Sequence, residues 1–122
     1  MTASIEIRRL YDSLQPGSEG GFRLFIDRLW PRGVARESFV FDLWCKDLAP
    51  EPELRKWFGH KTENWPKFSD QYRAWLRRDN QQRQIRAVLD QAGTRRIVLL
   101  YGARDPDHNH ALILAQEMNR LR

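Results

Sequence analysis

The sequence predicts an α/β fold: a single small layered domain with a short, mostly parallel sheet flanked by helices. Residues 96–101 (RIVLLY) form the clearest strand pattern and lead through a polar turn into a helical pattern over 108–121. Residues 22–27 (FRLFID) are apolar on nearly both faces, as in a central strand covered on both sides. This combination favours layered α/β packing over an antiparallel sandwich. Composition does not shift along the chain, so we expect one domain over residues 1–122.

The first half of the chain is predicted to consist of strands joined by loops. Alternation of apolar and polar residues marks strands, and clusters of Gly, Pro and Ser mark turns. The expected segments are a strand over 4–10, a turn over 13–21, the strand over 22–27 and a loop over 28–38. Residues 39–48 fit a short strand and a turn of buried helix equally well, so their structure stays open.

The second half is predicted to be mainly helical. The expected helices cover residues 53–58, 65–76, 81–92 and 108–121, with the strand at 96–101 before the last of them. Gly59 and Gly93 are placed to end the first and third helices. Asn64 is expected to cap the second helix, with Pro66 in its first turn, where a missing N–H costs little.

Charge and cysteine content narrow the expected partners. The formal net charge is +5, which favours anionic partners in general, although short basic runs mixed with acids are also typical of a solvated surface. Cys45 is the only cysteine, so no intramolecular disulfide can form and a reducing compartment is expected. The start of the chain lacks a signal-peptide pattern, and no apolar run approaches ~20 residues. We therefore expect a cytoplasmic protein with no membrane partner.

The first candidate site is the stretch YGARDPDHNHA, residues 101–111, between the last strand and the last helix. A helix N-terminus at the carboxyl edge of a parallel sheet attracts anions. Arg104 adds a planar guanidinium, Asn109 can donate and accept, and His110 can donate or move a proton near neutral pH. The alternative is structural, with an aspartate capping the helix and the histidines in solvent. His108 and His110 lie only two residues apart, a poor spacing for a shared metal on a helix, so no metal site is predicted.

The second candidate site is DRLWPRG, residues 27–33, at the end of the second strand. Arg28 and Arg32 are expected to emerge at the same sheet edge as Arg104 and to form an anion clamp with it. Asp27 is expected there as well, unless it only pairs with a nearby arginine. Trp30 is expected to be buried in the core rather than to stack on a ligand.

The remaining motifs do not specify a reaction. Residues 44–60 add positive charge through Lys46, Arg55, Lys56 and His60. Cys45 lacks the sequence context of an activated thiol, and we expect it to be buried. The sequence contains no GxGxxG, Walker or GxSxG motif.

Three stretches together resemble a known family: YDSLQPGSEGGFRLFIDRLWPRGVARE, LWCKDLAPEPELRKWFGH and LLYGARDPDHNHALIL. They are similar, in the same order, to the short, YeaO-like branch of the DUF488 family. The resemblance implies a compact bacterial-type α/β domain without an established activity. Some members carry transcription-regulator labels, but neither a recognition helix nor a wing is visible here. Where longer relatives tend to have Cys and a Cys-His-Arg motif, this chain has Tyr101 and Asn109-His110-Ala111. The histidine remains without the thiols, which puts a thiol mechanism in doubt.

These observations lead to a functional hypothesis with two alternatives. We expect a basic pocket for an anionic small molecule (phosphate, nucleotide or carboxylate), and no cofactor is indicated. The predicted pocket residues are Asp27, Arg28, Arg32, Arg104, Asn109 and His110. If the pocket is catalytic, His110 is the best general acid or base, oriented by Asp27 or Asp105. The alternatives are a nucleic-acid-binding module that uses the same arginines and a protein-interaction module with an exposed apolar patch.

Overall fold

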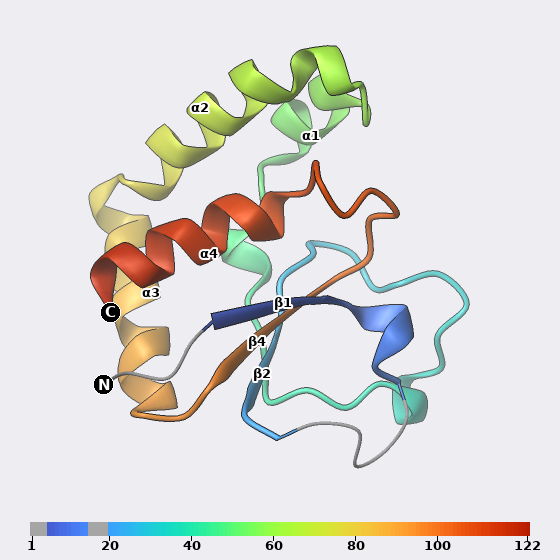
Figure 1. The fold of residues 1–122 in the computed structure, drawn as a ribbon, viewed down its shortest axis with the longest axis vertical. Coiled ribbons are helices and arrows are strands. Elements are labelled where there is room, and N and C mark those ends of the chain that lie inside the picture. Colours follow the sequence, from blue (N-terminus) through green and yellow to red (C-terminus); the bar gives the residue numbers. More distant parts are fainter. Residues whose placement is uncertain (1–4, 15–19) are drawn as a thin grey trace.

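A four-stranded sheet forms the centre of the computed structural model, which describes residues 5–14 and 20–122 (Figure 1). The strands are β1 (Ile5–Arg9), β2 (Phe22–Phe25), β3 (Leu43–Trp44) and β4 (Ile97–Tyr101). Their spatial order is β1-β4-β2-β3, and every neighbouring pair is parallel. The predicted α/β class is therefore confirmed. Most of the predicted turn over 13–21 lies outside the described residues.

The helices of the second half follow the predicted pattern closely. They are α1 (Pro52–Phe58), α2 (Trp65–Leu76), α3 (Asp79–Ala92) and α4 (His110–Leu121). Gly59 ends α1 in the left-handed conformation, with φ of 55°, as predicted. Asn64 stands at the N-cap position of α2 as predicted, but its side chain makes no capping hydrogen bond. Its amide instead donates to the carbonyls of Trp57 and Phe58 and joins α2 to the end of α1.

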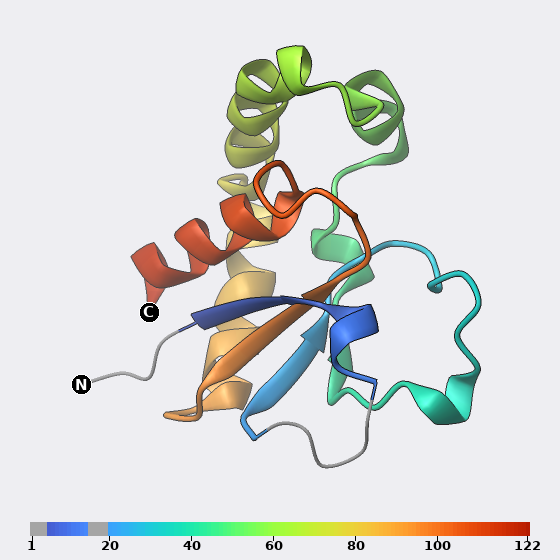
Figure 2. The ribbon, with the colours of Figure 1, turned by 45° about the vertical axis from the view of Figure 1, so that its right-hand side comes forward.

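Two cores lie on opposite faces of the sheet. The larger core lies between the sheet and α2, α3 and α4, which occupy one side of the molecule in Figure 2. On the other face, Phe25, Val98 and Leu100 of the strands pack against the irregular segment between β2 and β3. The strands β2 and β4 are covered on both sides and are buried along their whole length. This explains why their sequences are continuous apolar runs rather than alternating ones.

The segment left open by the sequence, residues 39–48, is irregular apart from two short elements. β3 is only two residues long, and residues Lys46–Leu48 form one turn of 3-10 helix. Trp30 packs against the second core, as expected, but it is only partly buried and also lines a cavity described below. Its indole N–H donates to the carbonyl of Val34 at 2.7 Å, and its ring packs edge-on against Phe25. Among the described residues, none of the helices has the length and apolar character needed to cross a membrane.

Candidate functional site

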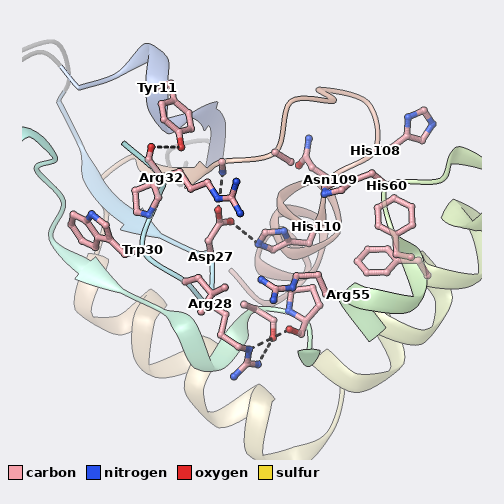
Figure 3. A pocket seen from close by; sticks show the side chains of 18 residues that line it. Tyr11, Asp27, Arg28, Trp30, Arg32, Arg55, His60, His108, Asn109 and His110 are labelled. Carbon is pink, nitrogen blue, oxygen red and sulfur yellow. Dashed lines mark hydrogen bonds and ion pairs between the residues drawn. The ribbon is translucent and has the colours of Figure 1, made fainter. Parts of the chain in front are cut away.

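A cavity of about 320 Å³ opens at the carboxyl ends of β2 and β4 (Figure 3). The loop after β2 lines one side and α1 with His60 lines another, while the turn after β4 and the start of α4 close the rest. Five of the residues predicted for the site line this cavity: Asp27, Arg28, Arg32, Asn109 and His110. Arg104 is exposed and is not among the lining residues. The carboxyl edge of the parallel sheet thus brings together two segments far apart in the sequence.

Asp27 joins the two strand ends beneath the cavity. Its Oδ2 accepts a hydrogen bond of 2.9 Å from the backbone N–H of Gly102, just after β4. A Cβ atom at position 102 would stand 2.9 Å from the same carboxylate oxygen, closer than such contacts normally come. Position 102 therefore favours glycine because the carboxylate of Asp27 needs the space.

His110 lies beside Asp27 at the first turn of α4. Its Nε2 is 2.9 Å from the carbonyl oxygen of Ile26 and 3.5 Å from Oδ1 of Asp27. A carbonyl oxygen only accepts, so Nε2 carries the proton and Nδ1 keeps its lone pair in the neutral ring. The ring also meets Tyr72 edge-on, with centroids 6.1 Å apart. Of the two carboxylates considered as its orienting partner, the structure places Asp27 next to His110, while Asp105 pairs with His108 at 2.8 Å.

Burial raises the pKa of the Asp27 carboxyl above its ordinary value of 3.8, despite the opposing effects of His110, the Gly102 N–H and Arg55. A raised pKa means that Asp27 is most favourable to folding below its unfolded-state pKa and loses that advantage as the pH rises through its folded-state pKa. The ionised carboxylate therefore costs stability at neutral pH.

We expect Asp27→Asn to raise the melting temperature at pH 7. The amide oxygen of the new side chain can still accept from Gly102 but carries no charge to desolvate. The free energy of unfolding at pH 7 should increase by about 1.4 kcal/mol for each unit by which folding raises the pKa of Asp27. This increase should vanish at pH values below the ordinary pKa, where the carboxyl is neutral in both states. Thermal melts across this pH range measure it, with Asp90→Asn on the exposed face of α3 as control. A gain that is independent of pH would contradict the explanation.

Asn109 is 2% exposed and organises the turn that leads into α4. Its amide nitrogen donates to the carbonyls of Asp105 and Pro106, at 3.0 and 3.2 Å. Its Oδ1 is buried and has no hydrogen-bond partner within the described part of the chain. Asp105 accepts from the N–H of Asp107 at 2.9 Å, so it closes the turn locally rather than capping α4.

The arginines of the cavity have different surroundings. Arg28 donates to the carbonyls of Ala49 and Pro50, at 2.9 and 3.3 Å, and so holds the segment ahead of α1. The side chains of Arg32 and Arg55 line the cavity and form no hydrogen bond or ion pair with any residue described in the structure. Both extend toward the Asp27–His110 pair in Figure 3. These two guanidinium groups are therefore available to a ligand.

Sequence reasoning counted Arg55 and His60 only as general positive charge, yet both line the cavity. Their position depends on how α1 packs, which local spacing does not reveal. His60 has φ of 59° and is the only described residue other than glycine with a positive φ. Strained backbone of this kind is often found at functional sites.

Among the described residues, the geometry indicates neither a reactive thiol nor a cluster of metal ligands. Cys45 is buried as expected, it does not line the cavity, and burial raises the pKa of its thiol to about 12. The neutral thiol is the unreactive form. Within residues 5–14 and 20–122, no three His, Cys, Asp or Glu side chains gather in a group that could hold a metal ion.

Comparison with known proteins places the chain in a family. Residues 4–121 match the family DUF488-N3i, described as the inactive DUF488-N3 subclade. Uncharacterized protein YeaO of Escherichia coli K12 is 35% identical over 118 residues, covering 97% of this chain and 99% of YeaO. Uncharacterized protein Rv3073c of Mycobacterium tuberculosis H37Rv is 30% identical over 115 residues, covering 94% and 93% of the two chains. No solved structure matches. Because both the family match and these relatives span nearly the whole chain, this protein belongs to the DUF488 family, in its YeaO-like branch.

Proposed function

We propose that this protein binds a small anionic molecule, with a phosphate or carboxylate group, in the cavity at the carboxyl edge of the sheet. The observation that carries the proposal is the pair of unpaired guanidinium groups, Arg32 and Arg55, which line one cavity from two different elements. Guanidinium groups are well matched to phosphate and carboxylate oxygens. A volume of about 320 Å³ suits a small metabolite.

Two further features of the cavity support an anionic ligand. α4 is a 12-residue helix whose first residue, His110, lines the cavity, so the positive end of the helix faces the same space. Burial raises the pKa of Asp27, so this carboxyl takes up a proton and loses its charge more readily than an exposed aspartate when an anion binds above it. Arg104 lies outside the lining, and we leave it out of the proposed site.

We propose binding without catalysis. The family to which the chain belongs is described as an inactive subclade. The Asp27–His110 pair resembles a general base with its orienting carboxylate. However, the thiol of Cys45 is not a nucleophile that this base could activate, because it is buried outside the cavity. We propose that the pair orders the carboxyl ends of β2 and β4 around the ligand. The single cysteine also supports a cytoplasmic location, which we propose on that ground.

The nucleic-acid alternative uses the same arginines but has less structural support. Trp30 lines the cavity, but it is only partly exposed and its ring packs against Phe25 and Phe39 of the second core. The more exposed Trp57 lies outside the cavity, so little indole surface is free for a base to stack on. Binding to a single-stranded oligonucleotide at about 50 mM salt, with a steep decrease at higher salt, would favour this alternative.

The test is a thermal-shift screen at about 50 mM salt with inorganic phosphate, adenosine 5′-monophosphate and citrate, followed by calorimetry of each probe that binds. Ligand binding to the folded state raises the melting temperature in a concentration-dependent way. We expect Arg32→Ala combined with Arg55→Ala to weaken binding at least about tenfold, because each lost charge-assisted hydrogen bond contributes roughly 1.5–3 kcal/mol.

Arg104→Ala is the matched control, since it removes an exposed guanidinium near the cavity but not in its lining. Its affinity for the probes should match that of the wild type. The proposal fails if none of the probes stabilises the wild type at millimolar concentration, or if the double variant binds as tightly as the wild type.

A further inference from the structure

We propose that β1 pairs with the β1 strand of a second copy of this protein, in antiparallel orientation, to form a dimer with one continuous sheet. This inference is independent of the ligand site. It rests on the open edge of the sheet, on the order of charges along β1 and on partly exposed apolar side chains beside that edge.

β1 has a neighbour on one side only in the sheet formed by the described residues. It pairs with β4 along its whole length, and its other side carries no strand. All five of its residues are half-buried, whereas all five residues of β4 are buried. The opposite edge is β3, which is two residues long and too short to template a stable pairing. The exposed hydrogen-bonding edge of the sheet is therefore that of β1.

Charge order along β1 selects one pairing. Glu6 and Arg8 lie on one face of the strand, on either side of Ile7. In an antiparallel pair centred on Ile7, Glu6 of each copy faces Arg8 of the other. Opposite charges placed directly across two strands stabilise the pair, and like charges destabilise it. A parallel pairing in the same register would put Glu6 against Glu6, so the charges favour the two-fold arrangement.

Existing contacts of Glu6 are compatible with this pairing. Within its own chain Glu6 forms ion pairs with Arg8 at 2.9 Å and with Arg96 at 3.0 Å, and all three side chains are about one-third exposed. Charges on an edge strand usually discourage pairing with other chains. Here Glu6 is negative and Arg8 is positive. The two charges therefore disfavour registers that place like charges opposite each other and favour the antiparallel register centred on Ile7.

Apolar side chains beside the edge supply additional area. Ile5 and Ile7 of β1, and Ala115 and Leu121 of α4, pack against the main core but remain partly exposed. α4 packs over β1 on the face of the sheet that carries the main core, and Figures 1 and 2 both show it next to β1. A stable interface needs roughly 1,000 Å² of buried surface, which a five-residue strand alone does not supply. The second copy must therefore also contact α4.

The first test is the oligomeric state in solution by sedimentation equilibrium. We expect the wild type to form a dimer at micromolar concentrations. Glu6→Lys should raise the dissociation constant at least about tenfold, because it sets two pairs of like charges across the interface. Arg8→Glu should act in the same way. The charge-swapped double variant, Glu6→Lys with Arg8→Glu, should recover most of the wild-type affinity. Glu37→Lys and Arg86→Glu, at exposed positions away from β1, are the matched controls and should leave the dimer unchanged.

The second test fixes the register. Ile7 is the position at which the two strands cross, so Ile7→Cys places two thiols opposite each other, with Cβ atoms about 4.5–5.5 Å apart. Mild oxidation should then give a covalent dimer, whereas Ile5→Cys should not, because position 5 faces Arg9 of the second copy. The native Cys45 is buried and serves as the unmodified background.

Three results would overturn the inference: a wild type that is monomeric at about 100 μM, a dimer that Glu6→Lys leaves intact, and equal crosslinking at positions 5 and 7. Circular dichroism of each variant separates loss of the dimer from loss of the fold. None of these measurements involves ligand binding, so their outcome tests the dimer independently of the proposed function.

Discussion

Phe25→Ala is expected to destabilise the protein by about 3–5 kcal/mol, the largest effect of any single substitution considered for this chain. Phe25 is fully buried at the end of β2 and is the centre of the second core. Its ring lies 5.1 Å from that of Phe39 and 5.2 Å from that of Trp44, between centroids. Aromatic neighbours held by the irregular segment cannot collapse easily into the space left by a missing ring, so most of the cavity should persist.

Urea unfolding followed by circular dichroism measures this effect. Phe25→Leu, which keeps much of the volume, should cost less than half as much as Phe25→Ala. Val40→Ala, at a position 57% exposed, is the control and should stay within about 0.5 kcal/mol of the wild type. Because Asp27 follows Phe25 by two residues, the alanine variant should also lose ligand affinity. A cost below about 1 kcal/mol would show that the second core contributes little to folding.

Glu117→Ala is expected to destabilise the protein by about 2 kcal/mol. Glu117 is 2% exposed on α4 and accepts hydrogen bonds from Arg120 at 3.0 Å, Arg77 at 3.3 Å and Gln82 at 3.3 Å. These contacts join α4 to the ends of α2 and α3. Removing one member of a fully buried ion pair would destabilise a protein by more than this. Here the arginine side chains are about half exposed, so water can solvate them once the carboxylate is gone.

The same carboxylate should contribute to acid sensitivity. Arg120 and Arg77 outweigh the effect of burial and hold the pKa of Glu117 below its ordinary value of 4.5. A lowered pKa means that the stabilisation is present above the unfolded-state pKa and is lost as the pH falls through the folded-state pKa. The stability difference between the wild type and Glu117→Ala, measured by urea unfolding, should therefore shrink below about pH 4.5. Glu53→Ala, at an exposed position in α1, is the control. A difference that is the same at pH 7 and in acid would contradict this role of the charge.

The regular elements could be predicted from the sequence because each carries its own local signal. The apolar run at 97–101 forms β4, and the helical stripes form α2 and α3. The segment 39–48 could not be resolved in advance, because β3 consists of two residues whose extended form depends on pairing with β2. Asn64 takes the predicted N-cap position, but its side chain does not cap α2 because its amide donates to the carbonyls at the end of α1 instead.

The candidate site was predictable where the sheet edge decides position. Two parallel strands end at the same edge, so Asp27 and His110 were expected near each other, and they lie 3.5 Å apart between Oδ1 and Nε2. The roles of the arginines depend on long-range packing and could not be read locally. Arg28 donates hydrogen bonds to the carbonyls of residues 49 and 50. Arg55 lines the cavity because of the way in which α1 packs.

The position of β4 between β1 and β2 determines when the sheet can form during synthesis on the ribosome. β1 and β2 are made first but never touch, because β4 lies between them and pairs Ile97 with both Ile5 and Phe22. In a chain emerging from the ribosome, β1 therefore has no strand partner, and β2 has only the two-residue β3, until Ile97–Tyr101 have been added. Such distant contacts slow folding, and the sheet can close only after β4 has been synthesised. β1 and β2 should therefore stay without their main partner during synthesis until β4 has left the ribosome.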